Sequence, residues 1–382
     1  MNPYSNLVQS TTDKIRIEIS EFHPDGKVPE WHVMLHPRQH TDSFPEQLSD
    51  ILACIPVLKQ KLGRSVILRF ARCFMSDASN QQQLVKEGWN QNPELKDTPL
   101  SLIQQPPLDG SKMVCWLYLS DPASTAYTHL FSASRIAEDS KEQGGDNDSE
   151  KQTLSVFKQY EEDLQREDCS VERNCVRTWL FVRDVDVNYA GVVKGRSDFF
   201  RTQGMTAETH FIASTGIQGQ TADANNKLSM DAYAIRGLQQ GQVAYLYAKT
   251  HLNPTYEYHV TFERGVSIQY GDRRHLWISG TASIDNKGQI LFPGDVARQT
   301  QRMWENVEAL LKEGGSSLED VQHLIVYLRD TADYEIVRAL FGKRFPHIPT
   351  VFLLAPVCRP GWLIEMECMA IALIGSDSYS DF

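Results

Sequence analysis

The sequence lacks the features of several large protein classes. No apolar run approaches the ~20 residues that a membrane-spanning helix needs, and the opening "MNPYSNLVQSTTDK" lacks the basic and then apolar pattern of a signal peptide. Positive charge is scarce, since the net charge is −11, whereas a nucleic-acid binder needs a basic face. We therefore expect a cytoplasmic protein that has neither a membrane nor a nucleic acid as its partner.

Motifs that mark common metal, nucleotide and hydrolase sites are also missing. The seven cysteines include no CxxC pair, and their odd, scattered positions indicate reduced thiols rather than a disulfide framework or a zinc site. The 11 histidines show no HxH or HExxH spacing. The chain also has no GxSxG nucleophile motif and no GxxxxGK[ST] phosphate loop. The residues by themselves thus imply no metal.

What is present is an ordinary globular composition with one biased segment. The 382 residues suffice for two or three domains, and 41% hydrophobic with 23% charged residues is typical of a soluble globular protein. Residues 138–152, "EDSKEQGGDNDSEKQ", are charged and free of large apolar side chains. We expect a disordered acidic loop or linker there.

An internal repeat organises the rest of the chain. Three apolar, strand-like segments begin at Ser65, Asn174 and Val321. Each reaches an aspartate and then enters a helix-like pattern; these aspartates are Asp77, Asp184 and Asp330. Each segment is also preceded by a helical pattern of apolar residues, over residues 44–62, 153–166 and 295–313, the last with Asp295 as its expected N-cap.

A second pair of similar segments supports the same repeat. "HLFSASRI", from His129, is similar to "HLWISGTASI", from His275, and we expect each to be the strand that opens a module. The sequence therefore predicts three tandem modules, over residues 1–120, 121–240 and 241–382, in which helices pack on one face of each sheet. The expected fold class is α+β, although the last strands of the first module, around "MVCWLYLSD", are poorly resolved by pattern.

The third module resembles the RidA/YjgF family, whose fold is also called chorismate mutase-like. The matching segments run in family order: "HLWISGTASI", "NVEALLKEGGSSLEDV", "LIVYLRD" and "IPTVFLLAPVCRPGWLIEMECMAIA". Members of that family are usually trimers with active sites in the clefts between subunits. Three such modules in one chain therefore look like a fused pseudo-trimer, so we expect a monomer, with dimerisation left open.

The whole chain resembles a narrower family, the chorismatases. The middle segment "NYAGVVKGRSDFFRTQGMTAETHFIASTGIQG" and the later "VTFERGVSIQYGDRRHLWISGTASID" both look like that family. Chorismatases remove the enolpyruvyl group of chorismate as pyruvate and use no metal or organic cofactor. One subgroup yields a dihydrodiol acid, another yields 3-hydroxybenzoate, and some members also yield 4-hydroxybenzoate. The resemblance implies chorismate as the small-molecule substrate.

Two glutamates in the last apolar run are candidates for the chemistry. Strand alternation places Glu365 and Glu367 on one face, about 6.6 Å apart. Burial among apolar neighbours raises a carboxyl pKa, and two carboxylates in one pocket would raise one of them further. From the pattern alone, a half-exposed strand with both side chains in water stays equally open. In the family pattern the catalytic glutamate matches Glu365, which leaves Glu367 a structural role.

The resemblance also bears on the product. Free cysteines are most often small core residues, but 3-hydroxybenzoate-forming chorismatases carry a cysteine just before the catalytic strand, where Cys358 stands. They also carry a glycine further upstream, which we match to Gly271, although a turn glycine is the alternative. Smaller side chains leave room for the ring to tilt so that its own hydroxyl attacks instead of water. The pair Gly271 and Cys358 therefore favours 3-hydroxybenzoate as the product.

A substrate with two carboxylates needs positive or donor groups, and arginine offers a bidentate fit. Our candidates lie in the two segments that resemble chorismatases: Arg196, Arg201, Arg264, Tyr189, Thr215 and Gly216. Each arginine taken alone is more often a surface residue, and the Thr-Gly pair is more often an ordinary turn at the end of a strand.

Two rival functions remain. A RidA-type imine or enamine deaminase relies on an arginine near the start of the strand "IPTVFLL", where Thr350 stands; Arg359 lies towards the far end of that region. A non-catalytic module that binds a small molecule would not require the glutamates.

Overall fold

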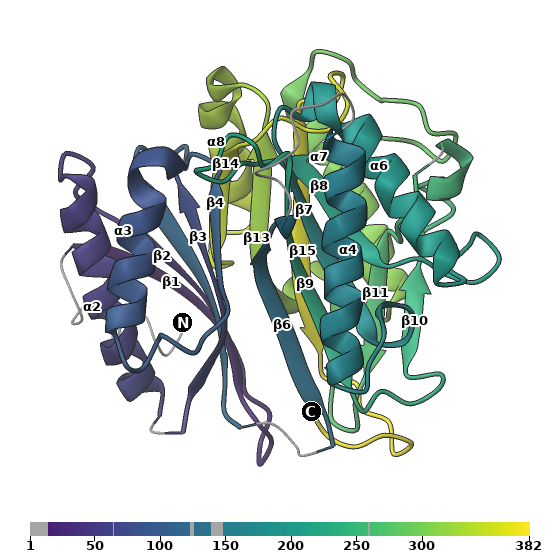
Figure 1. Ribbon diagram of the computed structural model, residues 1–382, viewed down its shortest axis with the longest axis horizontal. Coiled ribbons are helices and arrows are strands. Elements are labelled where there is room, and N and C mark those ends of the chain that lie inside the picture. The colour runs from purple at the N-terminus through teal and green to yellow at the C-terminus, as the bar shows by residue number, and fades with distance from the viewer. Residues whose placement is uncertain (1–13, 64, 123–125, 139–147, 259) are drawn as a thin grey trace.

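A computed structural model of the protein describes residues 14–63, 65–122, 126–138, 148–258 and 260–382 (Figure 1). The strands form three separate sheets, each built from one continuous part of the chain. Figure 1 shows helices α2 and α3 outside the first sheet, and the strands of the three sheets between the helix layers. None of the described helices is both long and apolar enough to cross a membrane.

The first sheet has five strands in the order β1-β2-β5-β3-β4. Its strands are β1 (Ile15–Phe22), β2 (Glu30–Pro37), β3 (Ile67–Met75), β4 (Leu100–Gln104) and β5 (Met113–Ser120). Helices α2 (Phe44–Leu62) and α3 (Ala78–Gln91) cover one face with their apolar stripes. Every residue of β5 is buried because its other face packs towards the centre of the molecule. Burial on both faces explains why this strand reads as a continuous apolar run.

The second sheet has four strands in the order β6-β9-β7-β8. They are β6 (Thr128–Arg135), β7 (Cys175–Val182), β8 (Ala213–Gln218) and β9 (Leu228–Arg236). Helices α4 (Asp148–Arg166) and α6 (Val185–Thr202) pack on it, and the short α5 (Val171–Asn174) leads into β7.

The third sheet has six strands in the order β10-β11-β12-β15-β13-β14. They are β10 (Val243–Leu246), β11 (Gly265–Gln269), β12 (Arg274–Ala282), β13 (Val321–Leu328), β14 (Thr350–Leu354) and β15 (Ile364–Ala372). Helix α7 (Val296–Glu313) packs on β12 and β15, and α8 (Tyr334–Arg344) lies against α7. Short 3₁₀ turns occur at Thr255–Tyr258, Leu318–Asp320 and Thr331–Asp333.

The sheet orders contain the same unit three times. Four strands repeat in equivalent order, β2-β5-β3-β4, then β6-β9-β7-β8, then β12-β15-β13-β14. In each unit the last two strands are parallel and the other pairs are antiparallel. The predicted α+β class with tandem modules is therefore confirmed. The module boundaries after residues 120 and 240 stay a prediction, because strand pairing does not show where independent folding units end.

Several local predictions can be compared with the structure. The helices expected at 44–62 and 295–313 are present as α2 and α7, and the Asp295 side chain accepts a hydrogen bond from the Arg298 N–H as an N-cap does. The strand from His129 opens the second sheet, but the strand from His275 does not open the third, since β10 and β11 precede it.

The prediction of an acidic loop at residues 138–152 is partly wrong. Residues 139–147 lie outside the described part of the chain, but residues 148–152 form the first turns of α4. Gln152 and Thr153 are buried there, and the amide of Gln152 donates to the Asn225 carbonyl at 2.9 Å. Polar residues that find partners in this way let α4 begin earlier in the chain than charge composition alone predicts.

The three sheets share one central core. Trp116 of β5 and Trp277 of β12 each lie edge-to-face with Trp179 of β7, with ring centroids 6.4 and 5.9 Å apart. Each tryptophan comes from a different sheet, so the aromatic contacts join all three units. Rings of this size bury much apolar area and prefer such offset geometry.

Each pair of sheets is also joined by a buried arginine–carboxylate contact. Arg72 Nη2 of β3 lies 2.7 Å from Asp231 of β9, and Arg177 Nη2 of β7 lies 2.7 Å from Glu367 of β15. Arg273 Nη1, just before β12, lies 2.6 Å from Glu30 of β2. None of these six side chains is more than 3% exposed. A buried charge that loses its partner is strongly destabilising, so each contact fixes how its two sheets meet.

We predict that Asp231→Ala lowers the free energy of unfolding by about 3–5 kcal/mol, because it leaves the Arg72 guanidinium buried without its main partner. Urea unfolding followed by circular dichroism measures the change. The matched control is Asp163→Ala, which breaks a half-exposed pair with Arg135 and is expected to cost about 1 kcal/mol or less. Equal effects of the two substitutions would contradict the prediction.

Candidate active site

A cavity of about 330 Å³ lies between the second and third sheets. One wall comes from α6 and β8, and the other from the segment before β11, the end of β12 and the approach to β15. Its volume falls at the lower end of the range that small-molecule sites occupy. The lining mixes aromatic and aliphatic side chains with arginines and one glutamate, Glu365.

Glu365 reaches this cavity from the central strand of the third sheet. On β15 it pairs with Ala282 of β12 and Tyr327 of β13, and the residue is 5% exposed. Burial raises the pKa of its carboxyl to about 8, the negative charge of Glu367 adds to the rise, and Arg264 and Arg177 oppose it. The side chain is therefore a protonated acid at neutral pH.

Glu367 lies two residues further along the same strand in a different environment. Its Oε2 accepts a hydrogen bond from Arg177 Nη2 at 2.7 Å, and its Oε1 accepts one from Trp179 Nε1 at 2.8 Å. The Thr215 hydroxyl also donates to Oε2. Three donors, one of them cationic, satisfy the oxygens of this carboxylate. The two glutamates thus share a strand face but have opposite surroundings.

Gly280 gives the Glu365 carboxyl its space. It lies in a β-bulge of β12, where the pairing with β15 shifts between Ile278 and Thr281. A Cβ at Gly280 would stand only 2.8 Å from Glu365 Cδ, and the Gly280 N–H donates to Thr215 Oγ1 at 2.9 Å. Sequence reasoning missed this residue. A glycine inside the apolar strand "HLWISGTAS" was the available signal, because such a glycine often marks a bulge or a close approach.

The structure does not bring Gly271 to the cavity, which corrects our expectation for it. Gly271 lies in the turn before β12, whereas Glu365 pairs with the last residue of that strand. Its N–H donates to the Ser380 carbonyl at 2.7 Å, and a Cβ there would meet the backbone of Tyr379. Gly271 therefore packs against the C-terminal segment of the chain. The expectation was wrong because the sequence alone does not show which glycine faces the glutamate.

Two of the three arginines proposed from sequence line the cavity. The buried Arg196 of α6 donates from Nε to Thr261 Oγ1 at 3.2 Å, and the buried Arg264 donates from Nη2 to the Asn253 carbonyl at 3.0 Å. Arg201 does not line the cavity. It is exposed on α6 and pairs with Asp198 at 3.1 Å.

Arg359 and Trp362, which we had not included among the site residues, also line the cavity. The Arg359 guanidinium lies 5.0 Å from the centroid of the Trp362 ring. With Arg196 and Arg264, three arginines therefore surround one small space, which favours an anionic ligand.

The remaining sequence candidates surround Glu365 or support it from behind. Tyr189 and Gly216 line the cavity, while the Thr215 hydroxyl lies behind it, bonded to Glu367 and Gly280. Cys358 lines the cavity too, where burial and then the charge of Glu365 raise the pKa of its thiol to about 12. The thiol therefore keeps its proton and acts as a small neutral wall, since a nucleophile would be a thiolate.

No cluster of three histidine, cysteine, aspartate or glutamate side chains that could hold a metal occurs among the described residues. What the described groups provide is one neutral carboxylic acid, three cations and an aromatic wall. A carboxylic acid with a pKa near neutrality suits general acid catalysis on an anionic substrate.

We predict that Glu367→Gln lowers the pKa of the Glu365 carboxyl by about one pH unit or more, because it removes a nearby negative charge and leaves Arg177 uncompensated. Carbon-13 NMR titration of the side-chain carboxyls measures this, with Glu365→Gln used to assign the resonance. A Glu365 resonance that titrates near the ordinary glutamate value in the unsubstituted protein would contradict the account of the site.

Comparison with known sequences identifies relatives of the third sheet. The family model described as endoribonuclease L-PSP matches residues 265–372. A RutC family protein of Pyrococcus abyssi is 33% identical over 97 residues, which span 25% of this chain and 76% of that protein. A 3-aminoacrylate deaminase RutC of Acinetobacter baylyi is 32% identical over 97 residues, spanning 25% of this chain and 77% of that protein.

Comparison with solved structures extends over more of the chain. A crystal structure of a chorismatase matches with a TM-score of 0.61 and 18% sequence identity, covering 80% of this chain and 93% of that one. This likeness shows a shared fold across the modules. The sequence relatives of the third sheet carry the identification: the chain belongs to the RutC family through its C-terminal module.

Proposed function

We propose that the protein is a chorismatase that cleaves the enolpyruvyl ether of chorismate to pyruvate and 3-hydroxybenzoate. The observation that carries the proposal is the buried, protonated Glu365 in a cavity lined by three arginines. The fold that the chain shares with a chorismatase is consistent with it.

The chemistry needs one acid at one carbon atom. An enol ether breaks down when its terminal methylene carbon takes a proton, because the neighbouring carbon then becomes an oxocarbenium ion. Glu365 supplies that proton, and its carboxylate form is left behind. A ring hydroxyl attacks the oxocarbenium carbon and gives up its own proton, which returns Glu365 to the acid form. In the resulting ketal, the bond between the ring and the oxygen of the attacking hydroxyl breaks, and so does the original ether bond to the former oxocarbenium carbon. Pyruvate leaves with the oxygen of the attacking hydroxyl as its keto oxygen. The ether oxygen stays on the ring and takes up the proton that its ring carbon loses as the ring becomes aromatic.

The cavity also provides for the two carboxylates of chorismate. Arg196, Arg264 and Arg359 approach it from α6, from the segment before β11 and from the segment before β15. Guanidinium groups bind carboxylates with paired hydrogen bonds, and burial strengthens such contacts. We assign the carboxylates to these three arginines, with Tyr189 as a further hydroxyl donor.

The choice of product follows from the side chains beside Glu365. Gly280 and Cys358 are both small and both line the cavity. We assign to Gly280 the role that we had given to Gly271, and we base the proposed product on Gly280 and Cys358. Space on these sides lets the substrate ring tilt its own hydroxyl towards the oxocarbenium carbon, whereas a bulkier pair would leave that attack to water and give a dihydrodiol acid.

Neither rival function is favoured by a specific observation. Thr350, at the position where RidA-type deaminases carry their arginine, begins β14 and donates its N–H to Glu18 at 2.9 Å. It lines a different cavity from the one that contains Glu365. We also propose that one chain suffices for activity, because both walls of the candidate active site come from the same chain.

The direct test is incubation of the purified chain with chorismate, followed by chromatography of the products. We predict that Glu365→Gln lowers the rate of pyruvate release about 10²–10⁴-fold, since the amide cannot donate the proton. The matched control is Glu308→Gln, an exposed glutamate of α7 that pairs with Arg344, and thermal unfolding confirms that each variant is folded. No pyruvate from the unsubstituted chain would overturn the proposal, and full activity in Glu365→Gln would place the acid elsewhere.

A second prediction concerns the product. Cys358→Val is expected to shift products from 3-hydroxybenzoate towards the dihydrodiol acid, because the larger side chain narrows the space beside Glu365. The matched control is Cys73→Val, which enlarges a buried strand cysteine of the first sheet. Quantitative chromatography gives the ratio. If the unsubstituted protein already makes only the dihydrodiol acid, the proposed chorismate cleavage stands and the argument from shape is wrong.

A further inference from the structure

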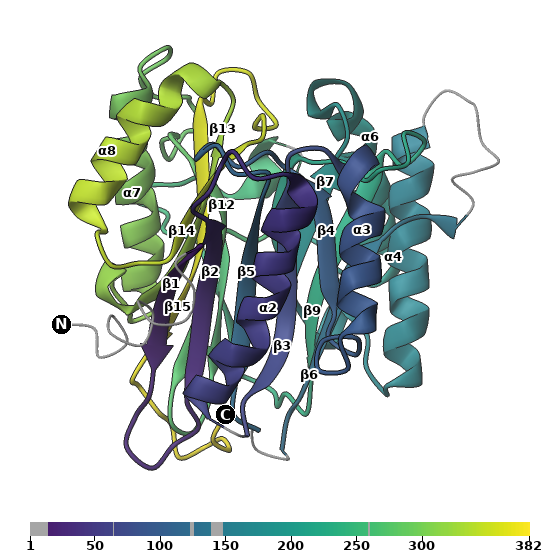
Figure 2. The ribbon, with the colours of Figure 1, turned by 90° about the vertical axis from the view of Figure 1, so that its left-hand side faces the viewer.

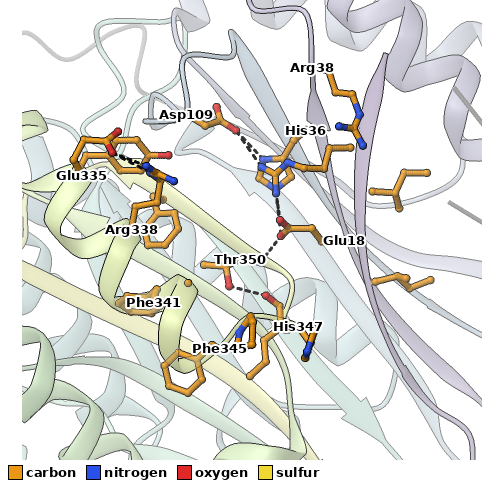
Figure 3. Close-up of a pocket in the computed structure, with 18 residues that line it drawn as sticks. Glu18, His36, Arg38, Asp109, Glu335, Arg338, Phe341, Phe345, His347 and Thr350 are labelled. Atoms are coloured by element: carbon orange, nitrogen blue, oxygen red, sulfur yellow. Dashed lines mark hydrogen bonds and ion pairs between the residues drawn. The ribbon is translucent and has the colours of Figure 1, made fainter. Parts of the chain in front are cut away.

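A second and larger cavity, of about 850 Å³, lies between the first and third sheets. Its walls come from β1 and β2 on one side and from α8 and β14 on the other (Figure 3). Figure 2 shows these elements side by side at the edge of the molecule away from α4 and α6. It shares no lining residue with the candidate active site.

The repeat makes this cavity the counterpart of the candidate active site. In the third sheet, α8 and β14 take the place that α6 and β8 take in the second. In the first sheet, β1 and β2 take the place of β11 and β12 in the third. Both cavities therefore form where the parallel edge of one module meets the antiparallel edge of the next.

The second cavity has no acid placed as Glu365 is. The first sheet has apolar residues, Met113 and Val114, at the corresponding end of its central strand β5. The cavity's own carboxylates are engaged: Asp109 with His36 at 2.8 Å and Glu335 with Arg338 at 2.7 Å, while Glu18 pairs with Arg16. Although burial opposes it, the hydrogen bond from His36 holds the pKa of Asp109 below its usual range. The groups present suit binding and not proton donation.

One wall is a continuous series of aromatic rings. Phe352 of β14 lies edge-to-face with Tyr334 and Phe341 of α8, at centroid distances of 5.8 and 5.3 Å, and Phe341 lies 5.7 Å from Phe345. Figure 3 shows Phe341 and Phe345 on the α8 side of the cavity. Both are buried and also pack edge-to-face on Trp304 of α7, so the half-buried Phe352 and Tyr334 are the rings more open to the cavity. Edge-to-face series of this kind accept a further ring with a favourable geometry.

The opposite wall carries an arginine that is available to a ligand. Arg38, at the end of β2, is exposed, and its guanidinium makes no hydrogen bond or ion pair among the residues that the structure describes. In Figure 3 it lies beside His36. Burial lowers the pKa of the neighbouring Arg16, and the positive charge of Arg38 adds to that effect. An anion between the two walls would relieve this repulsion.

We propose that this cavity binds an aromatic carboxylate, with its ring against Phe352 and Tyr334 and its carboxylate on Arg38. The site goes beyond the proposed cleavage of chorismate and does not depend on it. The same fold thus holds a reaction site at one module junction and a binding site at another.

The test is calorimetric titration with 2-naphthoate, which offers two fused rings and one carboxylate. We expect Arg38→Gln to weaken binding about tenfold and Phe352→Leu about threefold or more, while Arg166→Gln, an exposed arginine on α4, leaves it unchanged. Neutral 2-naphthamide is expected to bind at least about tenfold more weakly, since it lacks the charge. Thermal unfolding confirms that each variant is folded.

Three results would overturn the proposal: no binding of 2-naphthoate at millimolar concentration, equal binding by Arg38→Gln, or equal binding of naphthamide. Pyruvate release from chorismate by Arg38→Gln, measured in parallel, is expected to match the unsubstituted chain. The two experiments therefore test the second site and the proposed reaction separately, because either proposal can fail while the other stands.

Discussion

The ion pair between Arg177 and Glu367 is the contact on which the candidate site depends. It crosses from β7 of the second sheet to β15 of the third, with both side chains buried. It therefore joins two modules and fixes a negative charge two residues from Glu365. Burial and that charge both raise the pKa of the Glu365 carboxyl, so it keeps its proton at neutral pH. One strand face thus holds a glutamate that is paired with Arg177 and supports the structure, and a neutral one that faces the cavity.

Fusion of three modules in one chain allows their junctions to differ. All three are closed by a buried arginine–carboxylate contact, and in a symmetric trimer all three would have to carry the same cleft. Here the junction of the second and third modules carries an acid and three arginines, whereas the junction of the first and third carries an aromatic wall and an exposed arginine. The protein can keep one stable architecture while its clefts take different ligands.

Sequence patterns predicted the parts of the fold that depend on nearby residues. The apolar periodicity of α2 and α7 and the cap at Asp295 are local signals, and both helices are present. The placing of Glu365 and Glu367 on one strand face followed from alternation, and both lie on β15. The first turns of α4 were missed because their polar residues find partners near residue 225, which composition does not reveal.

Contacts between modules could not be predicted from the sequence. The sequence analysis did not single out Arg72 or Arg177, yet each meets a carboxylate more than a hundred residues away. The glycine beside the acid was misplaced for a related reason. Gly271 precedes β12 and Gly280 lies within it, and only the pairing of β12 with β15 shows which of them faces Glu365.

The central claim is that a neutral Glu365 protonates the substrate. Its most direct test is kcat/KM for pyruvate release from chorismate between pH 5 and 10, since this profile reports the essential acid of the free enzyme. The account predicts that activity persists through neutrality and falls as the pH rises through about 8, where Glu365 loses its proton. Activity that is already lost as the pH rises through the ordinary range of a glutamate, or that increases above pH 8, would contradict it.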